Sequence, residues 1–333
     1  MKNQKDISRW LLVIIFFIFF IIIVGGITRL TQSGLSIVEW NVVVGISPPL
    51  NDLEWNSEFD KYKQSPEYII NNSAINISDF KMIYFWEYLH RLLARILGFI
   101  ALFPLIYFIF TKKINPDQRS RFLIIPLLIG IQGLIGWLMV KSGLSMKTYN
   151  GIGVSHYWLS LHLFLALSTY CVVLWNYLKI NNSSLQYADC KELKYGITIF
   201  IMLFIQIIFG ALLAGLDGGS VTNRFPDING EFYPSNAFFD LSNPYFVHFI
   251  HRWLPFIIAF IAVFMFYKIK ENLSTVQKSL FGMFLGLFVI QIILGILTVL
   301  TSVNIMMAIM HQINAVFMLT ISLIILFSLS SKQ

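Results

Sequence analysis

Long apolar stretches, separated by polar segments, run along the whole chain. Eight of them approach the ~20 residues that an α-helix needs to cross the ~30 Å hydrocarbon core of a bilayer. The eight predicted spans are residues 10–28, 82–110, 121–141, 154–178, 195–215, 245–267, 279–301 and 305–329. The pattern therefore predicts an all-α integral membrane protein with eight transmembrane helices.

Composition and charge agree with a membrane protein. Of the 333 residues, 57% are hydrophobic and 12% are charged, whereas about a quarter are charged in soluble domains. Lysine and arginine gather before the first predicted span and in the short connections after the second, fourth and sixth. The two long connections, 30–80 and 216–244, are mixed to acidic. By the positive-inside rule, both termini are cytoplasmic and both long connections face outward.

This distribution also bears on partners and location. The net charge of +7 is accounted for by the cytoplasmic loops, so it gives no reason to expect nucleic-acid binding, and the expected surroundings are a lipid bilayer. The first apolar stretch is long and lacks an A-x-A cleavage site, which favours a retained helix over a cleaved signal peptide. With no Arg- and Ser-rich transit segment, a bacterial inner membrane is favoured over an organelle.

Polar residues inside the spans recur at similar offsets. The matched pairs are His90 with His251, 161 residues apart, Gln132 with Gln291, 159 apart, and His162 with His311, 149 apart. Such repetition predicts two tandem four-helix bundles, related by a pseudo-two-fold axis along the membrane normal. The expected halves are residues 1–180 and 191–330.

The four paired histidines all lie on the even-numbered predicted spans, ~5–8 residues from the outer end, and hence ~8–13 Å deep. A lone histidine in a membrane helix is as often a packing residue as a ligand, but four at one depth favour ligands. Two imidazoles from neighbouring helices of a bundle suit the axial positions of a haem. Three nearby arginines are candidates for the haem propionates, with snorkelling to lipid headgroups as the alternative. They are Arg91, Arg95 and Arg252.

The two halves differ three residues before the first histidine of each pair. Glu87 precedes His90, whereas His248 precedes His251. Residues i and i+3 share a helix face, and an acid inside a membrane is a candidate proton carrier. This asymmetry predicts chemistry in the first half, and electron transfer or a structural role in the second. The alternative is that Glu87 simply pairs with Arg91 one turn later.

Other polar and small residues receive structural interpretations. Gln132 and Gln291 are expected to form hydrogen bonds between helices rather than to act as ligands. A set of glycines is expected to mark close helix packing: Gly130, Gly133, Gly136, Gly282 and Gly286. Residues 40–68 are taken as a solvated loop, with a cap over the site or a docking segment as alternatives.

Several motifs together resemble the haem A synthase family over nearly the whole chain. They are VGGITRLTQSGLSIVEW (24–40), EYLHR (87–91), HYWLSLHLFLA (156–166), GALLAGLDGG (210–219), VHFIHR (247–252) and MHQINA (310–315). The resemblance implies a membrane oxidoreductase that oxidises the C8 methyl of haem O to a formyl group by successive hydroxylations, for cytochrome oxidase maturation.

The resemblance also implies roles for residues. A haem b cofactor would lie between His251 and His311, and the substrate haem O near His90 and His162, with Glu87 as the catalytic acid. It implies an electron donor, which the sequence does not identify, and delivery of haem O by a haem O synthase. The resemblance leaves open whether the protein forms a homo-oligomer.

One departure from the family pattern concerns cysteine. Some members carry a cysteine pair in the first outer loop, but this chain has only Cys171, in the inner part of a span, and Cys190, in a predicted cytoplasmic loop. Two other protein classes also fit parts of the pattern. A di-haem cytochrome b explains the four histidines but not Glu87, and a transporter explains repeated halves with buried polar groups.

Overall fold

The regular structure of the chain is helical. The computed structural model describes residues 2–39, 47–144, 153–181 and 192–330, and within these ranges the only β-type pairing is an isolated bridge between Ile228 and Glu231. The α-helices are α1 (Lys2–Leu30), α2 (Asp52–Lys63), α3 (Ile77–Phe110), α4 (Arg119–Gly143), α5 (His156–Asn181), α6 (Leu193–Gly215), α7 (Pro244–Ile269), α8 (Thr275–Leu300) and α9 (Ile305–Leu329). A π-helical turn covers Tyr68–Asn72, and 3₁₀ turns cover Pro116–Gln118, Gly218–Ser220 and Lys270–Asn272.

Eight of these helices are long and apolar enough to cross a membrane, namely all but α2. This confirms the predicted all-α membrane fold with eight spans. Several helices extend beyond the predicted apolar cores because polar side chains cap their ends. The clearest case is α3, which begins at Ile77 because the side chains of Asn76 and Asp79 form a reciprocal capping box there.

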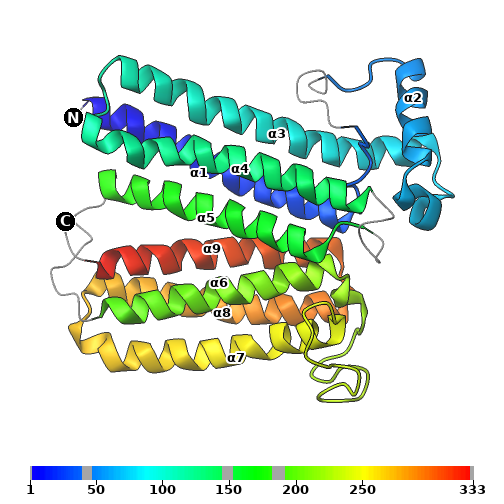
Figure 1. Cartoon of the computed structure of the whole chain (residues 1–333). Coiled ribbons are helices and arrows are strands. Elements are labelled where there is room, and N and C mark those ends of the chain that lie inside the picture. Colours follow the sequence, from blue (N-terminus) through cyan, green and yellow to red (C-terminus); the bar gives the residue numbers. More distant parts are fainter. Residues whose placement is uncertain (1, 40–46, 145–152, 182–191, 331–333) are drawn as a thin grey trace. The chain divides into compact units, whose positions relative to one another are not determined.

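The chain divides into two compact units. The first comprises residues 1–3 and 13–169, and the second comprises residues 4–12 and 170–333. In the first unit α3 and α4 pack together along their lengths (Figure 1). Thr28, near the end of α1, donates a hydrogen bond of 3.3 Å to the carbonyl oxygen of Trp86 on α3.

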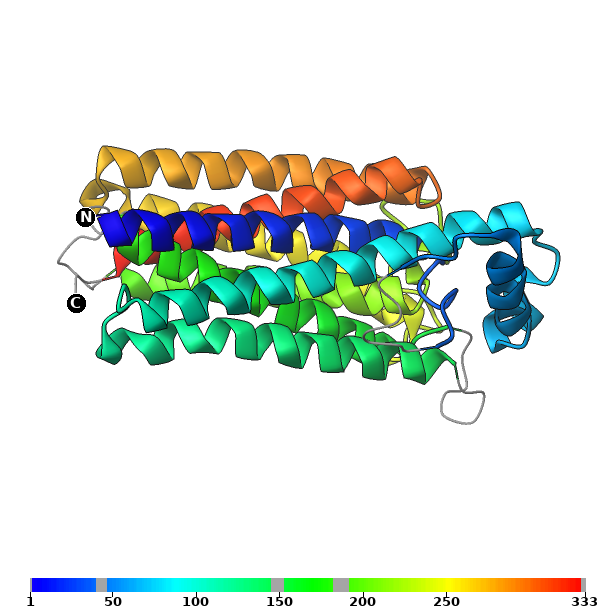
Figure 2. The same ribbon diagram turned by 90° about the horizontal axis from the view of Figure 1, so that it is seen from above.

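At the N-terminal end of α3 lies a cap, formed by residues 51–76. Its helix α2 runs crosswise against the first turns of α3, as Figures 1 and 2 show. An aromatic cluster holds it there: Phe59 and Tyr62 of α2 stack on Phe80 of α3, with ring centroids 5.0 and 5.3 Å apart. The solvated loop expected for residues 40–68 is therefore wrong where the structure describes it, because Trp55, Phe59 and Tyr62, spaced four and three residues apart, give this polar helix one apolar face.

The second unit contains α6, α7, α8 and α9. Helix α9 packs along both α8 and α6, and α6 packs along α7. The segment between α6 and α7 folds back onto its own helices, where Ala237 joins Leu212, Phe246 and Val247 in a buried cluster. Asn243 then caps α7 by accepting hydrogen bonds from the backbone N–H groups of Tyr245 and Phe246.

Most of the glycines expected to mark close packing do not do so. A Cβ atom added at Gly130, Gly133, Gly282 or Gly286 would meet no heavy atom of the described residues within 4 Å. The sequence-based interpretation of these four is therefore wrong for contacts inside the described chain. Gly136 does pack closely, against a histidine.

Candidate functional site

Each unit brings one predicted pair of histidines together. In the first unit His90 of α3 faces His162 of α5, with ring centroids 6.4 Å apart and ring planes at 82°. In the second unit His251 of α7 faces His311 of α9 at 6.3 Å and 76°. His162, His251 and His311 lie about two turns from the start of their helices, whereas His90 lies deeper in α3 because that helix extends into the cap.

A glycine on a neighbouring helix makes room for each of the four rings. Added Cβ atoms at Gly136 and Gly210 would approach Cε1 of His162 and of His251 to 2.8 and 2.9 Å. The same holds for Gly295, whose Cβ would come within 3.0 Å of His311 Cε1, and for Gly25, whose Cβ would lie 3.2 Å from His90 Nε2. Each histidine therefore depends on a position where any side chain would crowd its ring.

Glutamine amides hold three of the four rings. The amide nitrogen of Gln132 lies 3.1 Å from Nδ1 of His162 and donates to that residue's carbonyl oxygen at 2.9 Å. Gln206 makes the same two contacts with His251, both at 2.9 Å. The interhelical hydrogen bond predicted for Gln132 is thus present, and its partner is a candidate ligand.

At His311 the glutamine contact is on the other ring nitrogen. Gln291 places its amide nitrogen 3.2 Å from Nε2 of His311. Its oxygen accepts a hydrogen bond of 2.7 Å from Asn314, which also donates to the carbonyl oxygen of Leu287. The hydrogen bond predicted for Gln291 is therefore also present.

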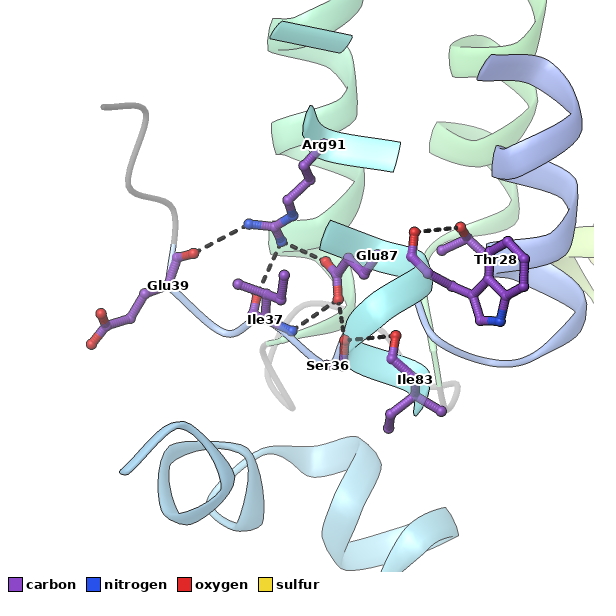
Figure 3. Close-up of polar contacts among 8 residues, drawn as sticks. Thr28, Ser36, Ile37, Glu39, Ile83, Glu87 and Arg91 are labelled. Atoms are coloured by element: carbon purple, nitrogen blue, oxygen red, sulfur yellow. Dashed lines mark hydrogen bonds and ion pairs between the residues drawn. The ribbon is translucent and has the colours of Figure 1, made fainter. Parts of the chain in front are cut away.

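Glu87 is buried at the end of the first site, with 3% of its surface exposed. Its Oε2 accepts hydrogen bonds from the Ser36 hydroxyl (2.7 Å) and the Ile37 backbone N–H (2.8 Å). Its Oε1 accepts one from Arg91 at 2.6 Å, which is also an ion pair. Figure 3 shows these donors converging on the carboxylate from the segment after α1 and from the next turn of α3. Glu87 does pair with Arg91, and the pair belongs to a larger network.

Two of the predicted arginines tie a connecting segment to a helix. Arg91 donates to the carbonyl oxygens of Ile37 (2.9 Å) and Glu39 (3.2 Å), as Figure 3 also shows. In the second unit Arg252 donates to the carbonyl oxygens of Pro226 and Asp227 at 3.1 and 2.6 Å.

Each of these two arginines also contacts the side chain one turn before it on its own helix. Arg91 binds the Glu87 carboxylate, and Arg252 lies 3.0 Å from Nε2 of the buried His248. Arg95, the third candidate, lies one turn further along α3 than Arg91 and is partly buried. The two units therefore share the arginine but differ in the residue one turn before it on the same helix.

The spacing of both pairs fits a metal held between two imidazoles. Two rings bound to one ion from opposite sides place their centroids about 6.2 Å apart, because a metal–nitrogen bond is about 2.0 Å and each ring nitrogen lies about 1.1 Å from its ring centre. The described residues contain no group of three or more His, Cys, Asp or Glu side chains that could hold a metal ion. A haem, which brings four ligands of its own, suits such pairs better than a non-haem ion.

Comparison with known proteins identifies the family of this chain. Residues 8–323 match the sequence model of the COX15-CtaA family, described as a cytochrome oxidase assembly protein. The chain belongs to this family. Among similar curated proteins, a heme A synthase of Rickettsia conorii is 40% identical, with 95% of each chain covered, and one of Orientia tsutsugamushi is 39% identical, with 96% of this chain and 95% of the relative covered. A heme A synthase of Pelagibacter ubique is 36% identical over 98% of this chain and 97% of its own length.

Some residues at the sites of this family member escaped the sequence analysis. Gln206 was not singled out. The four glycines that make room for the histidine rings, here called the cradle glycines (Gly25, Gly136, Gly210 and Gly295), were not recognised as neighbours of histidines. A signal does exist, because the spacing Gln-x-x-x-Gly occurs at 132–136, 206–210 and 291–295. Of the two cysteines, Cys171 is a free thiol within α5, and Cys190 lies outside the described residues.

Proposed function

We propose that this chain is a haem A synthase, an oxidoreductase that converts the C8 methyl of haem O to a formyl group by successive hydroxylations, for cytochrome oxidase assembly. The full-length similarity to heme A synthases carries the proposal. The two histidine pairs, each spaced for an axially held haem, and one buried acid beside only one pair give it independent support.

Each half has its own task in this proposal. His251 and His311 would hold haem b, which would supply electron transfer, within the half formed by residues 191–330. His90 and His162 bind the substrate haem O within the half formed by residues 1–180. The glycine cradles support both assignments, because they reserve space for the rings without adding competing side chains.

Glu87 handles protons at the substrate. All three groups that contact the Glu87 carboxyl are hydrogen-bond donors, so both of its oxygens act as acceptors in this site. We assign it the acceptance of a proton during oxidation of the substrate and the return of that proton when water leaves. Ser36 and the Ile37 N–H hold Oε2 in place for both steps.

The arginines and the surroundings complete the proposal. Arg91, Arg95 and Arg252 are assigned to the haem propionates, since guanidinium groups bind carboxylates well. We place the protein in a bacterial inner membrane, with both termini in the cytoplasm and the haem sites toward the outer side, as the charge distribution favours. Haem O delivered by a haem O synthase and a separate electron donor are the expected partners.

Pigment analysis of the purified protein tests this proposal. Wild type, Glu87→Gln and His251→Ala are compared by pyridine haemochrome spectra and chromatography of extracted haems. We expect haem b with some haem O and haem A in the wild type, no haem A in Glu87→Gln, and depleted haem b in His251→Ala. Glu58→Gln, a change of an acid on α2, is the control and retains haem A.

Other outcomes point to the other protein classes. Two equivalent haems b that Glu87→Gln leaves unchanged would instead support a di-haem cytochrome b. A colourless wild-type protein would exclude both functions and favour a transporter.

A further inference from the structure

The first and second sites differ in how the equivalent histidines are held. Gln206, one turn before the cradle glycine Gly210 on α6, contacts His251. On α1 the residue one turn before the cradle glycine Gly25 is Ile21. An isoleucine has no hydrogen-bonding group, so the counterpart of the glutamine is missing in the first unit.

The glutamine leaves the metal-binding nitrogen free. At His162 and at His251 the amide contacts Nδ1, while Nε2 forms no hydrogen bond with the described residues. The Oε1 atoms of Gln132 and Gln206 are buried and have no hydrogen-bond partner among the described residues. Each amide nitrogen also donates to the carbonyl oxygen of the same histidine at 2.9 Å. The glutamine therefore fixes both the ring and the main chain of its histidine.

His90 lacks this support and lies in a different setting. Its ring forms no hydrogen bond with the described part of the chain. The atom nearest to its cradle glycine is Nε2, whereas at Gly210 the nearest atom is Cε1 of His251. Because the partner of the non-ligating nitrogen fixes a ligating imidazole and strengthens its electron donation, His90 is the least constrained of the four rings.

We propose that Gln132 and Gln206 are positioning residues that fix His162 and His251 for iron binding, and that Ile21 leaves His90 as the exchangeable ligand through which the first site admits and releases its haem. This rests on the proposed function, in which one haem is resident and the other is substrate. At the resident site a glutamine contacts both rings, at Nδ1 of His251 and at Nε2 of His311. At the site whose haem must leave as product, one of the two rings has no such contact.

The first experiment replaces the glutamine at the resident site. In Gln206→Leu we expect haem b to bind about 10–100-fold more weakly. We also expect a shifted midpoint potential of this haem, because the contact that fixes Nδ1 of the ligating imidazole is lost. Gln277→Leu is the control, since Gln277 is a buried glutamine of α8 that donates to the Ser328 carbonyl oxygen rather than to a histidine. Wild-type potential and affinity in Gln206→Leu would overturn the proposal.

The second experiment adds the missing group. In Ile21→Gln we expect haem transfer from the first site to excess apomyoglobin to slow by about 10–100-fold, while Ile23→Gln, on another face of α1, keeps the wild-type rate. An unchanged rate in Ile21→Gln would overturn the role given to Ile21, even if Gln206→Leu could not be purified. A wild-type protein that binds no haem would instead refute the proposed function itself.

Discussion

Glu87 keeps its position through donors of three kinds: a hydroxyl group, a backbone N–H and a guanidinium. A hydrogen bond to a charged group contributes about 1.5–3 kcal/mol. The donors from Ser36 and Ile37 belong to the segment after α1, while Glu87 itself is on α3. The position of the Glu87 carboxylate therefore depends on the position of that segment.

Removing one donor should weaken the site without abolishing it. In Ser36→Ala we expect haem A formation to fall by about 10-fold, the equivalent of about 1.4 kcal/mol. The ratio of haem A to haem O in isolated membranes measures this. Ser160→Ala, which loses a hydrogen bond to the His156 carbonyl within α5, should keep the wild-type ratio. An unchanged ratio in Ser36→Ala would show that the backbone N–H and Arg91 suffice.

Two glycines on α4 offer a matched comparison. In Gly136→Ala the new Cβ would lie 2.8 Å from Cε1 of His162, so the ring must shift and binding of haem at the first site should be lost. In Gly133→Ala the new Cβ meets no described atom within 4 Å, so binding should persist. Haem titration of the two purified variants distinguishes them, and equal binding would refute the cradle role of Gly136.

Sequence alone predicted part of this residue-scale picture. The histidines and Glu87 stood out because ionisable groups are costly inside a membrane. Gln206 and Gly210 did not, because a glutamine or a glycine is acceptable on any membrane helix, and its role depends on which ring the neighbouring helix places beside it.

At the scale of elements, the cap shows what an apolar pattern misses. Helix α2 is too short and polar to cross a membrane, yet Phe59 and Tyr62 are buried against α3. Average hydropathy reports transfer into lipid, whereas this helix is held by aromatic stacking against protein. The eight spans were predictable because length and hydropathy alone define them; the start of α3 was not, because it depends on a capping box.

Glu67 makes the cap sensitive to pH. The side chain is buried, and its Oε2 has no partner among the described residues. Burial, together with the charge of Glu87, raises the pKa of this carboxyl to about 8, and Arg29 opposes the shift. An unfolded glutamate titrates near 4.3, so ionisation favours the unfolded form, and the stability of the cap falls as pH rises from about 4.3 to about 8.

Hydrogen exchange of the α2 amides measures this effect. After correction for the intrinsic exchange rate, protection in the wild type should decrease between pH 5 and 8. In Glu67→Gln the decrease should be absent. Asp60→Asn removes an exposed carboxylate of the same helix and should keep the decrease; a wild-type profile in Glu67→Gln would contradict the assignment.

At the scale of the whole molecule, the repeated pattern was visible in the sequence through the spacing of its histidines. The structure brings each pair together within its own unit. Orientation in the membrane and the division into residues 1–180 and 191–330 remain predictions, resting on the charges of the connections and on the repeat.

Reporter fusions test the orientation. Alkaline phosphatase, active only outside the cytoplasm, should be active when fused after residue 230 and inactive when fused after residue 185. A cytoplasmic fluorescent reporter should give the opposite pattern, because the basic connections stay inside. Reversed activities would invert the topology and place the histidine pairs nearer the cytoplasm.

Arg91 and Arg252 make the same kind of contact in the two units. Each binds main-chain oxygens of a neighbouring segment, whereas the side chain one turn before it is Glu87 in one unit and His248 in the other. The contact that holds the connecting segment is therefore separate from the residue that differs between the two sites. Each unit is a template for redesigning the other, and the exchange His248→Glu is the shortest route to a second acidic site in this chain.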